Sequence, residues 1–391
     1  MNVAILYVKL APFHFARLES AGKLWTERGA RLTCIEIARE QSNYSWGRSE
    51  YASDDFNYRT LFDGEYFSLK YRMIRQAINR ALDEVQPDVL VINGWGHKES
   101  VAALGWCCRN RVPRVLISDS QSIDSPRRKW KETIKRSFVA QCHAGFVGGA
   151  PHIRYLASLG LSPEFCVTGC DVVDNEMFLS AAKTRRETSA SPEQSSLRIL
   201  SCLRLLKIKN VPAALRSLAE LSAPWHWTIA GDGPERESIT DYARALGLGD
   251  RVHLPGHIRY SDLPGLYAAA DVYLQPSLSE PWGLAVNEAM AAGLPVVVSR
   301  QCGCHEDLVR EGVNGYTFDP RSGESLICAM EKFWERRGEW AQMGEASADI
   351  IKSWSLELFA RNLWRACELA HTRALELKGR VQPVARLCQV L

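Results

Sequence analysis

The chain has 391 residues, more than one compact core normally holds, so two domains of ordinary size are expected. Hydrophobic residues make up 46% of it and charged residues 24%, a balance that excludes a disordered or fibrous protein. The formal net charge is only +3, which excludes a general attraction to nucleic acid, and attraction to a membrane would need a local basic patch.

The apolar run at residues 1–7 is too short for a signal peptide and has no basic region before it, and no run reaches the length of about eighteen apolar residues that a membrane span needs. A cytoplasmic protein is therefore expected. The twelve cysteines lack paired spacing, which predicts small buried residues in a reducing compartment. Residues 302–306 contain two cysteines, a histidine and a glutamate, but one short loop cannot place four ligands, so no metal is expected.

The first part of the chain alternates short apolar runs with segments of helical period. Such alternation predicts βαβ units and a parallel sheet, hence a doubly wound, Rossmann-like domain over residues 1–178. Strands are expected at 3–8, 31–37, 88–93, 114–118 and 144–147, and helices at 15–28, 71–85, 98–109, 130–140 and 153–159.

A polar stretch at residues 179–196 predicts an exposed linker, after which the alternation restarts. A second doubly wound domain is expected over 197–354, followed at 355–391 by an amphipathic helix and a tail, and that helix must cover an apolar surface. Because ligands bind beyond the carboxyl ends of parallel strands, we expect the two sheets to face each other across a cleft that holds the active site. The second set of strands is expected at 197–203, 225–230, 252–254, 272–275, 295–299 and 316–318.

The strongest chemical pattern follows the fourth of these strands. From residue 279 the sequence reads S-E-P-W-G-L-A-V-N-E, so Glu280 lies in a polar loop and Glu288 in a helix that starts near Gly283. Gly283 lets a ligand approach the backbone, and the amides at a helix start, here those of Leu284 and Ala285, offer donors and positive potential to phosphate oxygens. Glu288 lies one turn further along, where a carboxylate can accept hydrogen bonds from both hydroxyls of a ribose. Two isolated glutamates would usually be solvated charges, but this pattern is longer than two residues.

The run at residues 279–298 resembles the E-x7-E signature of the family four retaining glycosyltransferases, E-P-[FW]-G-L-x-x-x-E-A-M-A-x-G-x-P-V-V. The resemblance implies the two-domain GT-B architecture, with the C-terminal helix crossing back to the N-terminal domain. It also implies metal-independent transfer of a sugar from a nucleotide diphosphate, with retention of configuration. Glu280 would then bind donor sugar hydroxyls, Glu288 would bind the ribose, and Trp282 would lie in the donor site.

Two cations stand at the end of the strand expected at 197–203. Arg204 and Lys209 are five residues apart and can both reach one diphosphate, although basic residues at a strand end are usually just exposed. They match a G-R-L-x-x-x-K-G element of the same family, except that Leu203 replaces the glycine before the arginine.

Two further segments resemble parts of the family's donor site. Gly231 and Gly233 match a G-x-G-P turn that lines the base and phosphate side of the donor. His257 and Ile258 match a loop near the nucleobase.

The first domain supplies three candidates for the acceptor side. His97 follows the strand at 88–93 and is the candidate for catalysis, with a structural role equally open. His14 either serves acceptor binding or caps its helix. Asp119 follows the strand at 114–118, where the family often has a histidine near the sixth carbon of the sugar, so donor specificity is expected to differ.

Two segments bear on the acceptor itself. Aromatic residues between 44 and 67 suit stacking on sugar rings, and suit packing of a long loop equally well. The helix that contains Arg127 to Arg136 is basic and has Trp130, Ile134 and Phe138 on its apolar side. Such a helix could lie on an anionic membrane, as a lipid-linked acceptor would require, or could be a solvated face over a buried one.

The sequence therefore predicts a glycosyltransferase without a cofactor, since the nucleotide sugar is a substrate. A UDP-sugar is favoured over a GDP-sugar, and the acceptor is a hydroxyl of a glycan, a glycolipid or a small molecule. A phosphorylase of the same architecture is one alternative, although it has less use for Glu288. A non-catalytic sugar-nucleotide-binding protein is the other, although it would not need both glutamates and both cations. No oligomeric state is predicted.

Overall fold

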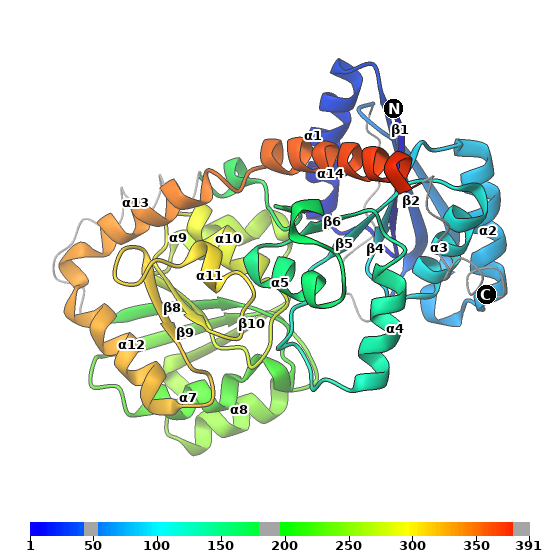
Figure 1. Ribbon diagram of the computed structural model, residues 1–391. Coiled ribbons are helices and arrows are strands. Elements are labelled where there is room, and N and C mark those ends of the chain that lie inside the picture. The colour runs from blue at the N-terminus through cyan, green and yellow to red at the C-terminus, as the bar shows by residue number, and fades with distance from the viewer. Residues whose placement is uncertain (43–53, 180–195, 378–391) are drawn as a thin grey trace. The chain divides into compact units, whose positions relative to one another are not determined.

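The computed structural model describes residues 1–42, 54–179 and 196–377 (Figure 1). The chain divides into two compact units. The first consists of Met1–Ser122, Pro126–Val172 and Leu356–Leu391, and the second of Ile123–Ser125 and Val173–Ser355. The expected linker lies outside the described residues except at its two ends, as does the tail beyond residue 377.

The first unit is built on a seven-stranded parallel sheet in the order β3-β2-β1-β4-β5-β6-β7. Its strands are β1 (Asn2–Tyr7), β2 (Arg31–Glu40), β3 (Asn57–Glu65), β4 (Val89–Asn93), β5 (Arg114–Ser118), β6 (Ala144–Val147) and β7 (Cys166–Thr168). Its helices are α1 (Pro12–Glu27), α2 (Tyr71–Val85), α3 (Lys98–Asn110), α4 (Lys129–Val139), α5 (Ala150–Ser158) and α14 (Leu356–Leu377), with 3-10 turns η1 (Tyr66–Ser68) and η2 (Pro163–Phe165). All five expected strands are present, and β3 and β7 are additional.

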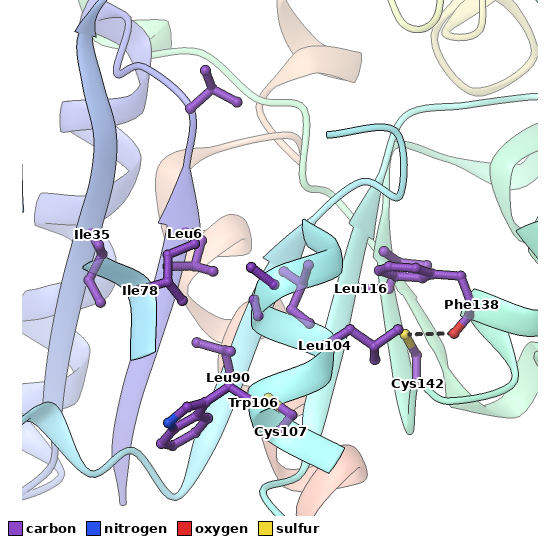
Figure 2. Packing of buried hydrophobic residues seen from close by; sticks show 14 of the residues in the cluster. Leu6, Ile35, Ile78, Leu90, Leu104, Trp106, Cys107, Leu116, Phe138 and Cys142 are labelled. Atoms are coloured by element: carbon purple, nitrogen blue, oxygen red, sulfur yellow. Dashed lines mark hydrogen bonds between the residues drawn. The ribbon is translucent and has the colours of Figure 1, made fainter. Parts of the chain in front are cut away.

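The core of this unit lies between the sheet and helices α2, α3 and α4 (Figure 2). Leu6, Leu90 and Leu116 from three adjacent strands are fully buried there, because strands of a covered parallel sheet have apolar residues on both faces. Phe138 and Cys142, near the end of α4, fill the far side of the same cluster.

The aromatic segment before α2 is partly strand and partly core. Phe56 and Tyr66 are buried, whereas Tyr58 and Phe67 are 36% and 48% exposed. The structure thus places two of the expected stacking residues in packing roles. Tyr44, Trp46 and Tyr51 lie outside the described residues.

Helix α14 packs on α1 and on the sheet of the first unit. Phe359 is fully buried and its ring lies 5.2 Å from that of Phe146 on β6, while the rings of Trp364 and Trp25 on α1 are 5.0 Å apart. The expectation that the C-terminal helix returns to the first domain is therefore confirmed.

The second unit has a six-stranded parallel sheet in the order β10-β9-β8-β11-β12-β13. Its strands are β8 (Leu197–Cys202), β9 (Trp225–Ala230), β10 (Val252–Gly256), β11 (Val272–Gln275), β12 (Val296–Ser299) and β13 (Gly315–Phe318). Its helices are α7 (Val211–Ala219), α8 (Arg236–Ala245), α9 (Leu263–Ala268), α10 (Leu284–Ala291), α11 (His305–Leu308), α12 (Gly323–Glu335) and α13 (Trp340–Ile351). The 3-10 turns are η3 (Lys207–Lys209), η4 (Gly249–Arg251), η5 (Tyr260–Asp262) and η6 (Arg337–Glu339).

Both sheets are doubly wound, as expected. In each, the strand order runs outward in one direction from β1 or β8 and in the other direction from β4 or β11. Such a switch point leaves an opening at the carboxyl ends of the two central strands, where open α/β sheets bind ligands. Among the described residues, no helix combines the length and the apolar character that a membrane span requires.

Candidate functional site

The candidate site lies at the switch point of the second sheet. Strands β8 and β11 are direct neighbours there, with Ile199 opposite Val272. The loop after β8 and the loop after β11 leave the sheet together, and the Leu278 N–H donates to the Ile208 carbonyl at 2.8 Å. The fold thereby brings the 203–210 segment and the 276–283 segment into contact.

Lys209 and Glu280 meet at this point. The Lys209 ammonium donates to Glu280 Oε2, and the two side chains are only 12% and 16% exposed. Lys209 ends the short turn η3, and Asn210 follows it in the left-handed conformation with its side-chain amide donating to the Pro320 carbonyl at 2.9 Å. The backbone at Lys209 is therefore fixed, and the Lys209 side chain is held against Glu280 from the neighbouring loop.

A chain of hydrogen bonds fixes the Glu280 carboxylate from behind. Gln275, the last residue of β11, donates from Nε2 to Glu280 Oε2 at 3.2 Å and to Ser277 Oγ at 2.8 Å. The Tyr273 hydroxyl donates to Gln275 Oε1 at 2.6 Å, which orients the amide. The Ser277 hydroxyl donates to the same Glu280 oxygen at 3.4 Å.

Helix α10 starts at a position that requires glycine. Gly283 has φ +106°, and a Cβ there would lie 2.6 Å from Cys302 Sγ. Cys302 and Cys304 are buried beneath this turn with their sulfur atoms 3.5 Å apart. In the described part of the chain, no group of three or more His, Cys, Asp or Glu side chains is placed to hold a metal ion.

The first amides of α10, including those of Leu284 and Ala285, have no partner within the helix because no residue precedes them by a full turn. They carry the positive end of the helix dipole. Their position directly after the Glu280 loop places this potential beside Lys209.

Glu288 lies inside α10 and is 6% exposed. Its Oε2 accepts a hydrogen bond from the Tyr267 hydroxyl at 2.6 Å. Burial disfavours the charged carboxylate and raises the pKa of Glu288 to about 7, although the Tyr267 hydrogen bond acts in the opposite direction. The carboxyl can therefore gain or lose its proton near neutral pH.

The glycine turn after β9 packs against the segment that carries Arg204. A Cβ on Gly231 would lie 1.9 Å from the Leu203 carbonyl oxygen, and one on Gly233 would lie 2.5 Å from that of Leu205. Leu203 and Leu205 are buried, and Arg204 between them is exposed. The turn therefore packs closely against the backbone on both sides of Arg204.

Three other expected donor residues differ in their surroundings. The Trp282 side chain is 2% exposed, donates to Asn287 Oδ1 at 2.9 Å and packs 4.9 Å from the Trp354 ring. It is a core residue, so any contact of Trp282 with a donor would come from its backbone. His257 is exposed just beyond β10, and Ile258 is partly buried against the core around α10.

The expected acceptor-side residues lie in the first unit, near the carboxyl ends of its strands. His14 Nδ1 accepts from the Ala11 N–H at 2.9 Å at the start of α1. Burial, with the nearby Arg17 charge, holds the pKa of His14 well below its usual value, so the ring is neutral. His97 is exposed before α3, and Asp119 is exposed after β5.

Residues 183–349 match the family model described as "Glycosyl transferases group 1". The match lies within the second unit and is a likeness to this family over that part of the chain. An uncharacterized glycosyltransferase of Methanocaldococcus jannaschii is 32% identical to it over 154 residues, which are 39% of this chain and 38% of that relative. The aligned part spans less than half of the length of the first curated relatives that the chain matches.

Solved structures resemble this chain over nearly its whole length. A sucrose-phosphate synthase from Thermosynechococcus elongatus has a TM-score of 0.74 at 17% identity, covering 93% of this chain and 98% of that one. HepE of Anabaena, solved in complex with UDP and glucose, has a TM-score of 0.70 at 16% identity, with the same coverage. This likeness shows the fold, which is GT-B.

Sequence reasoning did not identify Tyr267, Gln275 and Ser277 as members of this site. Gln275 and Ser277 did carry a signal, because a polar side chain at the carboxyl end of a buried parallel strand faces the ligand edge of the sheet. Tyr267 lies 21 residues before Glu288 and comes close only through the packing of α9 on α10.

Proposed function

We propose that this chain is a group 1 glycosyl transferase that moves a sugar from a nucleoside diphosphate donor, with UDP as the favoured nucleotide, to a hydroxyl acceptor. The observation that carries the proposal is the contact of Lys209 with Glu280 at the switch point of the second sheet, directly before the start of α10. The resemblance to HepE, which binds UDP, supports the choice of base.

The diphosphate leaving group would bind where positive charge converges. Lys209 and Arg204 supply two full charges, and the first amides of α10 supply the helix dipole. Charge stabilisation at the leaving group is the largest help that a protein gives to such a reaction. These groups would take the place that a metal ion holds in other transferases.

The two glutamates would bind the two sugars of the donor. Glu280 would accept hydrogen bonds from hydroxyls of the transferred sugar, and Glu288 from the ribose. In the retaining reaction, the acceptor hydroxyl attacks the anomeric carbon on the face that the diphosphate leaves. The anomeric carbon–phosphate oxygen bond breaks, the bond to the acceptor oxygen forms, and the departing phosphate oxygen takes the acceptor proton.

The acceptor would bind at the first unit, which carries His97, His14 and Asp119 near the carboxyl ends of its strands. His97 is the exposed member of the two histidines and is the one proposed for catalysis. His14, neutral and bonded to the Ala11 amide, would position an acceptor only through its second ring nitrogen.

Protection against thermal unfolding by a ligand panel tests the proposal directly. A ligand at about a hundred times its Kd adds about 2.7 kcal/mol to the free energy of unfolding, a shift that a thermal scan resolves. UDP-glucose and UDP are expected to protect more than GDP-mannose. Protection by glucose 1-phosphate without a nucleotide would indicate the phosphorylase, and binding without transfer or hydrolysis would indicate a non-catalytic protein.

Replacement of Gln275 by leucine is expected to lower kcat for transfer about tenfold, the size of one hydrogen bond to a charged group. The change removes the Gln275 amide that donates to Glu280, and it leaves the Tyr273 hydroxyl with only the more distant Cys202 carbonyl, at 3.4 Å, as acceptor. Steady-state kinetics with the donor found in the panel measure the effect. Gln141→Leu is the matched control. The buried Gln141 Nε2 has no hydrogen-bond partner in the structure, and Gln141 lies in the first unit, whereas Glu280 lies in the second. An unchanged kcat in Gln275→Leu would show that Glu280 needs no positioning from β11.

A further inference from the structure

Helix α4 of the first unit, labelled in Figure 1, has two large exposed apolar side chains. Trp130 is 58% exposed and Ile134 is 61% exposed. They are four residues apart, so they lie one above the other on the same side of the helix. Phe138, one turn further, is only 8% exposed and belongs to the core (Figure 2). The C-terminal end of α4 is thus packed into the core of the unit, and its earlier turns expose an apolar pair to solvent.

The single acidic residue of α4 faces away from this pair. Glu132 Oε1 accepts from the Lys135 ammonium at 2.9 Å, and Arg127 lies 3.5 Å from the same oxygen. Glu132 Oε2 accepts from the Tyr155 hydroxyl at 2.9 Å. Two of the basic residues in this segment are therefore neutralised on the inner side of the helix.

Of the remaining basic residues, Lys129 and Lys131 adjoin Trp130 in the sequence, whereas Arg128 and Arg136 each stand four residues from Glu132 and so lie on its side of the helix. Arg128, Lys129, Lys131 and Arg136 are all exposed. None of these four forms a salt bridge with a carboxylate in the residues that the structure describes. The Lys131 ammonium lies 5.5 Å from the Trp130 ring centre, and Arg136 donates to the Ser158 carbonyl at 3.1 Å. The outer face of α4 combines uncompensated positive charge with an exposed indole and an exposed branched aliphatic chain.

We propose that this outer face of α4 docks on the surface of a bilayer that contains anionic phospholipid. Trp130 and Ile134 would enter the boundary between headgroups and acyl chains, and the Lys129 and Lys131 ammonium groups would contact lipid phosphates. Tryptophan is enriched at that boundary because its ring is apolar while its N–H is polar, and surface cations gain energy from anionic lipids. The docking stands independently of the chemistry, and on the proposed function it would bring the transferase to a lipid-linked acceptor.

Vesicle co-sedimentation of the full chain tests the docking. Large vesicles of phosphatidylcholine with about 30% phosphatidylglycerol are compared with vesicles of phosphatidylcholine alone, at low and at high salt. The protein is expected to bind the anionic vesicles, less at high salt, and to leave the neutral ones unbound. Trp130→Ser/Ile134→Ser and Lys129→Ser/Lys131→Ser are each expected to weaken binding at least about tenfold, the second also reducing the salt dependence.

A control on α2 matches the first variants. Arg72 is exposed and Met73 is 45% exposed, so Arg72→Ser/Met73→Ser removes a surface cation and a surface apolar side chain elsewhere on the same unit, and its vesicle binding is expected to be unchanged. Thermal protection by UDP, measured on all variants without lipid, separates loss of docking from failure of the donor site. Equal binding to neutral vesicles, or no binding to anionic ones, would overturn the proposal. Self-association of the free protein that Trp130→Ser/Ile134→Ser abolishes would also overturn it, since a second copy would then cover the face.

Discussion

Replacement of Lys209 by alanine is expected to lower kcat/KM for transfer at least about a hundredfold, the size of effect seen when one charge-stabilising group is removed from a reacting centre. Lys209 is the cation that the fold holds against Glu280, in a position only 12% exposed, where little water is present to weaken its charge. Alanine would leave the diphosphate with Arg204 and the helix amides alone. Initial rates at donor concentrations below KM measure the loss.

Lys207→Ala is the matched control for this variant. Lys207 lies two residues earlier in the same 3-10 turn but is exposed, so its removal is expected to change kcat/KM no more than about twofold, as is usual for a solvated surface charge. Near-normal rates in Lys209→Ala, with the variant folded, would reject the donor site. Equal losses in both variants would mean that general positive charge, and not the placed ammonium, binds the donor.

Most of the fold follows from the sequence because its strands are short, apolar and separated by segments of helical period. The two strands that were not expected, β3 and β7, lie at the two edges of the first sheet. The sequence of β3, N-Y-R-T-L-F-D-G-E, is mostly polar and none of its residues is buried, and β7 has only three residues. An edge strand has only one neighbouring strand and is less buried than a central one, so it leaves a weaker apolar pattern.

The charged residues of the site could be predicted, whereas the residues that orient them could not. Lys209 and Glu280 stand at strand ends in a recognisable spacing, and the sheet order then brings them together. Tyr267 reaches Glu288 from another helix, and no local pattern in the sequence encodes that distance. Spacing along the chain therefore identifies charges, while the tertiary fold decides which neutral groups fix them.

The direction of a large side chain is equally difficult to read from sequence. Trp282 stands inside a ligand-binding pattern, yet its ring is buried because Asn287 and Trp354 provide its contacts. Trp130 and Ile134 have the spacing of a buried helix face, yet both are exposed. In each case the position of the neighbouring elements decides whether the side chain is covered.

Replacement of Glu288 by alanine is expected to lower transfer at least about a hundredfold, because it removes the group proposed to bind the ribose. The Glu288→Gln variant tests whether the charge of this carboxylate contributes to donor binding. The pKa of Glu288 is about 7, so the unliganded carboxyl is mostly protonated at pH 6 and mostly ionised at pH 8. In the proposed site two ribose hydroxyls would donate to it, which would favour the ionised form, and the wild-type Kd for a UDP-sugar is expected to be about tenfold weaker at pH 6 than at pH 8.

Calorimetric titration of UDP-glucose between pH 6 and pH 8 measures this dependence, and the intact nucleotide sugar suits it because it lacks the terminal phosphate that titrates near pH 6. Glu288→Gln cannot ionise, so its weaker binding is expected to be constant over this range. Tyr267→Phe removes the hydrogen bond that lowers the pKa of Glu288, so its midpoint is expected at a higher pH than that of the wild type. A wild-type Kd that does not change with pH would contradict binding of the donor to an ionising Glu288 carboxylate.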